Sequence, residues 1–142
     1  MKKIVLSAEG LSLEDLVAVA RRGAGVALSG KSKKAIRKSR NLVEQWIRQG
    51  KIVYGMTTGF GALSDVVISK EDTQKLQQNV LMSHAAGVGP ALEEEAVRAV
   101  MALRIKDLAR GNAGIRLETV QNLIELLNGN VCPVVPEKGS VG

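Results

Sequence analysis

The sequence predicts a mainly α-helical fold with a few short strands, and two observations carry this prediction. First, 45% of the 142 residues are apolar but only 2% are aromatic, so the core is expected to consist of Leu, Val, Ile and Ala side chains. Second, apolar residues recur three and four positions apart along most of the chain, which is typical of helices that pack on helices. No apolar run approaches the length of a membrane-spanning helix.

The chain is expected to begin with a short strand and a short helix. Residues 4–6 are β-prone and predict the strand. Ser12 has Asp15 three positions later, which resembles a capping box, and apolar residues at helical spacing follow it as far as Gly23. A glycine in this place commonly ends a helix.

A longer helix is expected to begin at Ser29 or Ser32 and to end at Gly50. Its outer face carries much of the formal charge of +6, in Lys31, Lys33, Lys34, Arg37, Lys38 and Arg40. No aromatic residues interleave with this cluster and no zinc-finger spacing is present, so nucleic-acid binding is not expected. The cluster indicates a solvated helix face, or a surface that a partner subunit covers.

Residues 52–53 favour extended chain, so a short strand is expected around the loop that begins at Tyr54. Ser69 with Asp72 then predicts the start of a helix that runs towards Ser83–His84. The glycines that begin at Gly87 are expected to stop it.

The remaining third of the chain predicts two more helices. Pro90 suits the first turn of one of them, because a proline at that position gives up no helical hydrogen bond. Acidic residues near its start and basic residues near its end match the helix dipole. The last helix is expected to end at Gly129, and the prolines that follow favour an extended path towards a turn.

Cys132 is the only cysteine, which excludes a disulfide within these residues and a site of several cysteines, so no metal is expected. One cysteine fits a reducing cytoplasm, and that location is expected. Lys2 and Lys3 resemble the start of a secretion signal. The apolar run that follows stops at Ser7, however, so no export segment is expected.

Residues 54–61 gather scarce residue types in one place. They hold the only Tyr and the only Phe of the chain, with three glycines, so the backbone there either turns tightly or approaches another group closely. Tyr54 on such a loop is a candidate proton carrier. The alternative is a turn in which Tyr54 and Phe60 fill a small core.

His84 is the only histidine, and the small residues after it leave room beside its ring. Imidazole exchanges protons near neutral pH, so His84 is a second candidate for chemistry; the alternative is a capping or packing residue at a helix end. The glycines at 87–89 come with neither a P-loop lysine nor a dinucleotide fingerprint. The residues alone therefore indicate a helical domain with two candidate proton-transfer side chains.

Three segments resemble, in order and spacing, three consecutive signatures of the histidine and aromatic amino-acid ammonia-lyases. They are residues 54–61 (YGMTTGFG), 83–89 (SHAAGVG) and 133–142 (PVVPEKGSVG). Members of this family are several times longer, mostly α-helical and homotetrameric, with active sites shared between subunits. The resemblance implies that residues 1–142 are the helical N-terminal portion of a single larger catalytic domain, with no internal boundary.

The resemblance also implies a cofactor. In the family, Gly-Ser-Val-Gly is followed by Ala-Ser-Gly, which cyclises and dehydrates unaided into 4-methylidene-imidazol-5-one. This electrophile is expected directly after Gly142, in the remainder of the same polypeptide, so isolated 1–142 is not expected to be active. The amine of an amino-acid substrate attacks the electrophile, and loss of a β-proton and of ammonia gives an α,β-unsaturated acid.

Roles for individual residues follow from the same resemblance. Tyr54 matches the catalytic base; because a phenol is protonated near neutral pH, this role requires nearby positive charge or hydrogen bonds that favour the phenolate. Gly61 matches a loop glycine beside the substrate and the electrophile, and Gly142 adjoins the electrophile. The Ser83–His84 pair resembles the histidine-specific branch, in which an imidazole at this position hydrogen-bonds the substrate's imidazole.

The Ser83–His84 pair favours L-histidine as substrate and urocanate as product. One departure stands against it, because histidine lyases usually have Asn where this chain has Thr57. A Thr there together with a Ser-His pair also occurs in aminomutases of the family, so an aromatic amino-acid aminomutase, or a tyrosine or phenylalanine ammonia-lyase, is the alternative. An inactive helical assembly module without the electrophile is an alternative of a different class.

Overall fold

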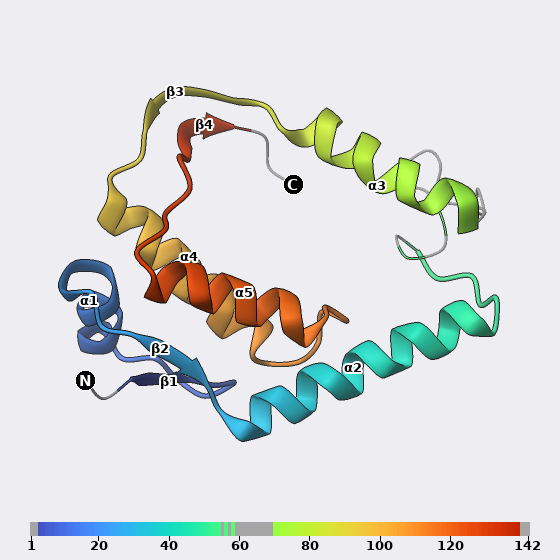
Figure 1. The fold of residues 1–142 in the computed structure, drawn as a ribbon, viewed down its shortest axis with the longest axis horizontal. Helices are drawn as coiled ribbons and strands as arrows, with labels where there is room; N and C mark the ends of the chain where they lie inside the picture. Colours follow the sequence, from blue (N-terminus) through green and yellow to red (C-terminus); the bar gives the residue numbers. More distant parts are fainter. Residues whose placement is uncertain (1–2, 55, 57, 59–69, 140–142) are drawn as a thin grey trace. The chain divides into compact units, whose positions relative to one another are not determined.

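Helices predominate in the computed structural model of the chain, which describes residues 3–54, 56, 58 and 70–139 (Figure 1). The mainly helical fold with short strands is therefore confirmed. None of the helices in these ranges is long and apolar enough to cross a membrane. In chain order the elements are β1 (Ile4–Leu6), α1 (Leu13–Arg22), β2 (Val26–Leu28), α2 (Gly30–Arg48), α3 (Lys70–His84), β3 (Gly87–Ala91), α4 (Glu94–Leu108), α5 (Leu117–Asn128) and β4 (Pro136–Gly139).

The chain divides into two compact units. The first comprises Met1–Asn41 and Ala91–Val135, and the second comprises Leu42–Pro90 and Pro136–Gly142. Each unit thus combines stretches that are far apart in the sequence. That residues 1–142 belong to a single larger domain without an internal boundary stays a prediction.

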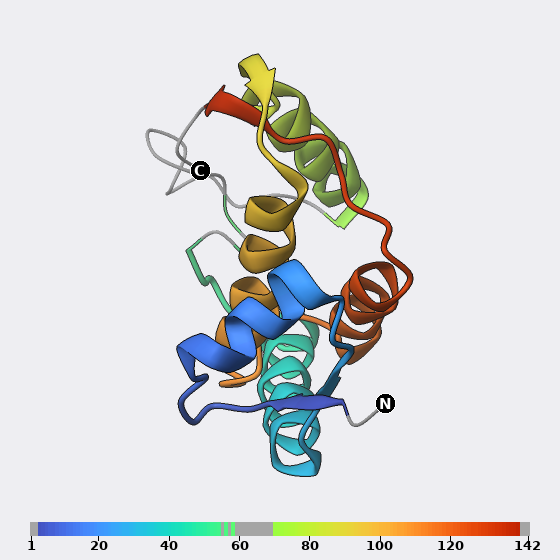
Figure 2. The same ribbon diagram turned by 90° about the vertical axis from the view of Figure 1, so that its left-hand side faces the viewer.

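The first unit holds an aliphatic core between helices and a small parallel sheet. β1 pairs with β2 in register from Ile4 opposite Val26 to Leu6 opposite Leu28. α1 and α5 both pack on α4, and β2 contacts α5 (Figure 2). The most deeply buried side chains of this unit are Leu6, Val19, Val26, Ile36, Ile105, Val120 and Leu127. Their types agree with the composition, because aliphatic side chains predominate in this core.

Two serines were possible caps for α2, and the structure distinguishes them. The Ser29 side-chain oxygen accepts the backbone N–H of Ser32 at 3.0 Å, so Ser29 is the N-cap. Ser32 lies inside the helix, is almost fully buried, and accepts the Ser29 hydroxyl at 2.9 Å. The other predicted cap is confirmed, because Ser12 accepts the N–H of Asp15 at 3.0 Å.

Arg98 of α4 joins the C-terminal ends of two helices. Its side chain is only 4% exposed, donating from Nε to the Val19 carbonyl of α1 at 3.0 Å and from Nη1 to the Leu127 carbonyl of α5 at 3.2 Å. Nη1 also donates to the Asn130 side-chain oxygen at 2.8 Å. Carbonyls at helix ends lack partners within the helix and carry partial negative charge, so one buried cation satisfies two such ends at once.

Asn128 extends the sheet from the end of α5. Its side-chain oxygen accepts the Val26 N–H at 2.7 Å, and its side-chain nitrogen donates to the Val26 carbonyl at 3.0 Å. The amide thus makes on β2 the two hydrogen bonds that a further strand would make. This contact fixes α5 against the sheet.

The segment between α4 and α5 rests on the N-terminal half of α2. Gly111 has φ +76° and approaches Ala35 so closely that an added Cβ would lie 2.6 Å from the Ala35 carbonyl carbon. The Gly114 N–H donates to the Ser39 hydroxyl at 2.9 Å. Glycine at 111 therefore satisfies both a left-handed backbone and a close approach.

The second unit contains the end of α2, the segment around Tyr54, α3, and the strands β3 and β4. Of the strand expected around Tyr54, the described residues contain a single bridge residue, Thr58. The expected start of α3 at Ser69 lies outside the described residues. α3 ends at His84, before the glycines that were predicted to stop it.

The prediction that Pro90 begins the next helix is wrong. Pro90 lies in β3, and α4 begins at Glu94 with Glu93 as its N-cap. The φ angle that proline requires suits extended chain as well as a first helical turn, and a two-stranded sheet tolerates a residue without an N–H donor. The pairing of β3 with β4, invisible in the local sequence, decides between the two.

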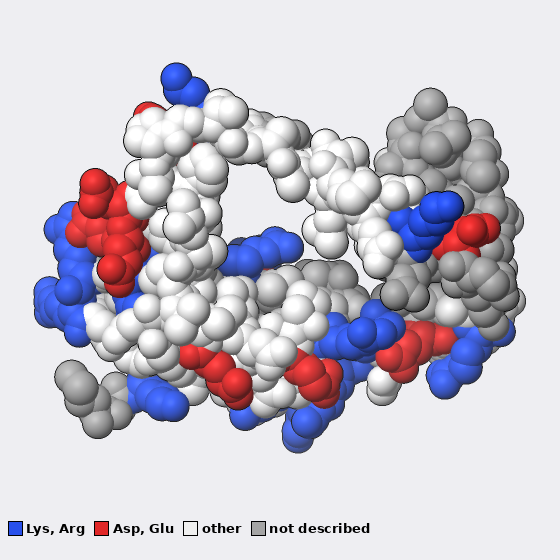
Figure 3. Space-filling model, turned by 45° about the horizontal axis from the view of Figure 1, so that its top comes forward, with Lys and Arg blue, Asp and Glu red and all other residues white. Residues whose placement is uncertain are grey.

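The basic residues do not form a continuous basic surface on the face shown in Figure 3, where Lys and Arg are interspersed with Asp and Glu. On α2, Lys31, Lys34, Arg37 and Lys38 are exposed. Arg40 instead turns to the loop before α5, donating to the Gly114 carbonyl at 3.4 Å. This distribution fits the predicted solvated helix face.

Replacing Arg98 with Met is expected to lower the free energy of unfolding by about 3 kcal/mol or more, because two buried carbonyls and the Asn130 amide lose a charged donor. Urea denaturation followed by circular dichroism measures the change. Arg104→Met is the matched control: it lies on the same helix but its side chain is 61% exposed in its pair with Asp107, and a change within about 0.5 kcal/mol is expected. Equal losses in the two variants would contradict the proposed role of Arg98.

Candidate active site

Tyr54 lies on a turn that follows α2. The Val53 carbonyl accepts the Met56 N–H at 3.1 Å, which closes a four-residue turn with Tyr54 at its first corner. The Tyr54 side chain is 64% exposed. The alternative in which Tyr54 fills a small core is therefore not supported by the described residues.

His84 is the last residue of α3, and its ring is held from its own helix. Nδ1 lies 2.9 Å from the Val80 carbonyl oxygen, one turn earlier, and 2.9 Å from the Ser83 hydroxyl. The Ser83 hydroxyl in turn lies 3.1 Å from the same Val80 oxygen. His84 and Ser83 are exposed, so the other ring nitrogen remains available for a ligand.

The segment that carries His84 is joined to the end of the chain by the pairing of β3 with β4. The two strands run in opposite directions (Figure 1), and the Leu92 N–H continues the pairing by donating to the Val135 carbonyl at 2.8 Å. Parts of two of the three sequence segments singled out above, residues 87–89 and 136–139, thus lie side by side although they are far apart in the sequence.

Glycines permit this close approach of the two strands. A Cβ added to Gly87 would lie 2.7 Å from Cγ of Pro136, and one added to Gly139 would lie 3.2 Å from the Ala86 carbonyl oxygen. Gly89 has φ +94°, a backbone conformation that residues other than glycine rarely adopt. The geometry of the strand pair therefore explains the glycines after His84, and phosphate binding is not needed to explain them.

The remaining expected site residues, Gly61 and Gly142, lie outside the described residues, as does Thr57. Tyr54, Ser83 and His84 all belong to the second unit, but their meeting around one substrate stays a prediction. No group of three or more His, Cys, Asp or Glu residues that could hold a metal ion exists in the part of the chain that the structure describes.

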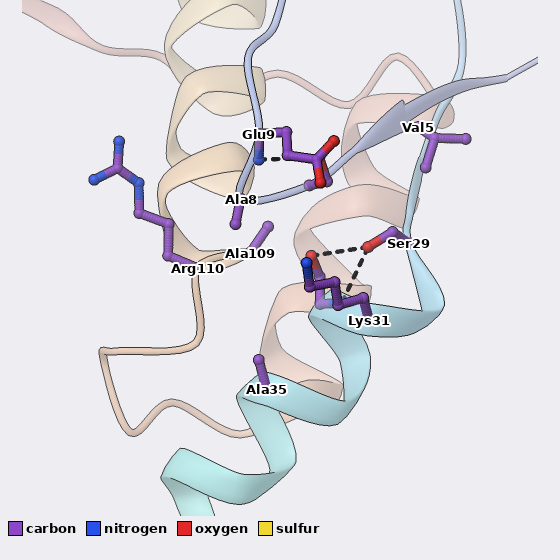
Figure 4. A pocket seen from close by; sticks show the side chains of 10 residues that line it. Val5, Ala8, Glu9, Ser29, Lys31, Ala35, Ala109 and Arg110 are labelled. Carbon is purple, nitrogen blue, oxygen red and sulfur yellow. Dashed lines mark hydrogen bonds between the residues drawn. The ribbon is translucent and has the colours of Figure 1, made fainter.

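One cavity of about 430 Å³ lies in the first unit. It is bounded by the loop after β1, the start of α2 and the end of α4 (Figure 4). Ser29, Lys31 and Arg110 are among its lining residues, with Glu9 opposite in charge. Ser29 already serves as the helix cap, and neither Tyr54 nor His84 lines the cavity, so it is not the candidate site.

Sequence reasoning missed the groups that orient the candidate residues. The Val80 carbonyl and the Pro136 ring contact His84 and Gly87 respectively, yet neither residue type suggests a site. In a helix, the carbonyl of the residue four positions earlier lies within reach of a terminal His ring, so the predicted helix gave a signal for the Val80 contact. The contact with Pro136 depends on strand pairing and had no local signal.

Comparisons with known proteins agree on one family. The profile described as "Aromatic amino acid lyase" matches residues 11–142. The chain is 56% identical over all its 142 residues to a histidine ammonia-lyase of Caldanaerobacter subterraneus subsp. tengcongensis, and spans 28% of that protein.

Solved structures of similar fold include two kinds of enzyme. One is tyrosine aminomutase from Streptomyces globisporus, with a TM-score of 0.90 and 34% identity over 98% of this chain and 26% of that one. Another is histidine ammonia-lyase from Trypanosoma cruzi, with a TM-score of 0.89 and 34% identity over 99% of this chain and 27% of that one. The chain thus spans little more than a quarter of the proteins it matches.

Replacing Gly87 with Ala is expected to loosen the pairing of β3 with β4, because the new methyl group overlaps the Pro136 ring. Hydrogen exchange measured by mass spectrometry should show faster exchange in peptides that cover β3 and β4 and no change in those that cover α5. Gly10→Ala is the matched control, since nothing lies within 4 Å of the added Cβ. Unchanged exchange of both strands in Gly87→Ala would contradict the contact.

Proposed function

The chain belongs to the aromatic amino acid lyase family, and from this premise we propose that it forms part of an ammonia-lyase that converts L-histidine to urocanate. The observation that carries the proposal is the 56% identity, over all 142 residues of this chain, to a histidine ammonia-lyase. The Ser83–His84 pair supports the same substrate, because an imidazole at this position suits hydrogen bonding to the imidazole of histidine.

A second candidate is an aromatic amino-acid aminomutase. The similarity to tyrosine aminomutase and the Thr at position 57 favour it, and the same kind of electrophile and base serve both reactions. Product analysis separates the two, since an aminomutase returns a β-amino acid and a lyase releases ammonia. The 34% identity to tyrosine aminomutase is lower than the 56% identity to the Caldanaerobacter histidine ammonia-lyase, so the lyase is preferred.

Tyr54 is the proposed base that takes the β-proton of the substrate. It is the only phenol in the chain, it is exposed, and it stands on a turn between longer elements. A phenol acts as a base only where positive charge or hydrogen bonds favour the phenolate. Those groups are expected on other parts of the complete protein.

Gly61, Ser83 and His84 are proposed to surround the substrate. His84 would orient the ring of the amino acid, so that its β-carbon faces Tyr54. Gly61 would leave space for the substrate where a side chain would intrude. The β3–β4 pair supports this arrangement, because it keeps the His84 segment beside the strand that leads to Gly142.

The family uses a methylidene-imidazolone group. The 142 residues contain no Ala-Ser-Gly tripeptide, so the group cannot form within them. When present, it supplies an electrophile for the substrate's amine. We propose that it follows Gly142, and reading the next three residues tests this: any tripeptide other than Ala-Ser-Gly would leave the helical assembly module as the preferred function.

The complete protein is proposed to be a cytoplasmic homotetramer with active sites shared between subunits. Sedimentation velocity of the complete protein tests the assembly. Exposed apolar side chains on α3, such as Leu81 and Met82 at 71% and 74%, are consistent with contacts to further protein.

The direct test of the activity is the growth of urocanate absorbance when the complete protein is given L-histidine. L-Tyrosine and L-phenylalanine, supplied at the same concentration, are the control substrates. Turnover of tyrosine without turnover of histidine would reject the histidine assignment, and a β-amino acid product would indicate the aminomutase.

Replacing Tyr54 with Phe in the complete protein is expected to lower kcat by at least about 100-fold, because general-base catalysis contributes about that much or more. The fold and the absorbance of the electrophile should be unchanged, since only an exposed hydroxyl is deleted. Steady-state kinetics and circular dichroism measure the two properties. Wild-type kcat in this variant would exclude Tyr54 as the base.

Replacing His84 with Leu is expected to raise KM for L-histidine by about tenfold, because one hydrogen bond to the substrate is lost. The variant is also expected to favour substrates with bulkier apolar rings. Kinetics with L-histidine and L-phenylalanine measure the change in selectivity. If L-histidine turnover is retained without a rise in KM, the selectivity residue has been misassigned.

A further inference from the structure

The hydrogen bonds around His84 determine which of its ring nitrogens carries the proton in the neutral form. A neutral imidazole has one N–H donor and one bare acceptor nitrogen. Nδ1 lies within 2.9 Å of two oxygens, the Val80 carbonyl and the Ser83 hydroxyl. The protonation state of Nδ1 must therefore be compatible with hydrogen bonding to both oxygens.

The carbonyl oxygen of Val80 decides the assignment, because it can only accept. The Ser83 hydroxyl donates its single hydrogen to this oxygen at 3.1 Å, which leaves the hydroxyl with lone pairs towards the ring. A proton on Nδ1 then gives both oxygens a donor. Without it, the Nδ1 lone pair would face the carbonyl lone pairs at 2.9 Å, which is repulsive.

We infer that Val80 and Ser83 hold His84 as the Nδ1–H tautomer, so that Nε2 presents a bare lone pair to the substrate. The position of the ring supports this assignment, because the carbonyl groups at the C-terminal end of α3 carry partial negative charge that favours a proton on their side of the ring. Val80 and Ser83 are thus positioning residues, which act on the substrate through His84.

The consequence is a requirement on the substrate, and it rests on the proposed function. A ring that meets Nε2 must bring an N–H or O–H donor, as imidazole and phenol do and a plain phenyl or thienyl ring does not. Leaving Nε2 without a donor costs a hydrogen bond, so kcat/KM for a ring without a donor should be lower by about tenfold or more.

The tautomer is tested directly in the complete protein labelled with ¹⁵N-histidine. A long-range ¹H–¹⁵N correlation spectrum, recorded where the ring is neutral, shows which nitrogen carries the proton, and His84→Gln identifies the signals of His84 by their loss. The expected pattern has the proton on Nδ1. A proton on Nε2 would overturn the inference.

Ser83→Ala distinguishes the two neighbours of Nδ1. This variant keeps the Val80 carbonyl, so the Nδ1–H pattern is expected to persist; a switch to Nε2–H would overturn the assignment of the decisive role to the carbonyl. Ser83→Thr keeps the hydroxyl and is expected to preserve the wild-type spectrum.

The requirement on the substrate is measured as the ratio of kcat/KM for L-histidine to that for thienylalanine, in wild type and in His84→Leu. A ratio of about ten or more that falls in His84→Leu supports the inference, and a ratio unaffected by that change overturns it. Absence of urocanate formation by the wild type would reject the proposed function instead, while the spectrum would still report the tautomer.

Discussion

The first unit depends on one buried cation. Arg98 lies on α4, on which α1 and α5 pack, and donates to a carbonyl in the last turn of each of these two helices. An arginine buried to this degree has lost most of its hydration, and helix-end carbonyls together with the Asn130 oxygen replace it. The cost of burying the charge is thereby offset by satisfying groups that would otherwise be orphaned. Aliphatic packing supplies the bulk of the stabilisation, but this contact defines where the helices end relative to one another.

A second constraint acts in the other unit, where the backbones of β3 and β4 pair. β3 and β4 approach so closely that Gly87 has no room for a side chain beside Pro136. The pair connects the helix end that carries His84 with the strand that leads to Gly142. If His84 and the electrophile have the roles proposed above, turnover requires a constant distance between them. A strand pair does this better than a loop, because its hydrogen bonds and its glycines leave few alternative arrangements.

Much of the fold was readable from local patterns, and the exceptions have physical reasons. The caps at Ser12 and Gly23 and the helical periods were predicted correctly, since each depends on neighbours within one or two turns. Pro90 was misplaced because its φ angle fits both a helix start and a strand. Tyr54 and His84 were singled out as candidate site residues from their scarcity and from family resemblance, and their roles stay predictions. The Val80 carbonyl was not singled out, because any residue type supplies a carbonyl.

The sequence by itself determined the helical class, the aliphatic composition of the core and membership of a lyase family, because periodicity, composition and long motifs are properties of the letters. Only the tertiary structure decided that Arg98 serves two helix ends, that Asn128 binds the edge of β2, and that the segments around 87 and 136 lie together. These outcomes depend on contacts between residues far apart in the sequence, such as the hydrogen bond from the Val26 N–H to the Asn128 side-chain oxygen, 102 positions away. Such contacts are set by the packing of whole elements, which no short stretch of sequence encodes.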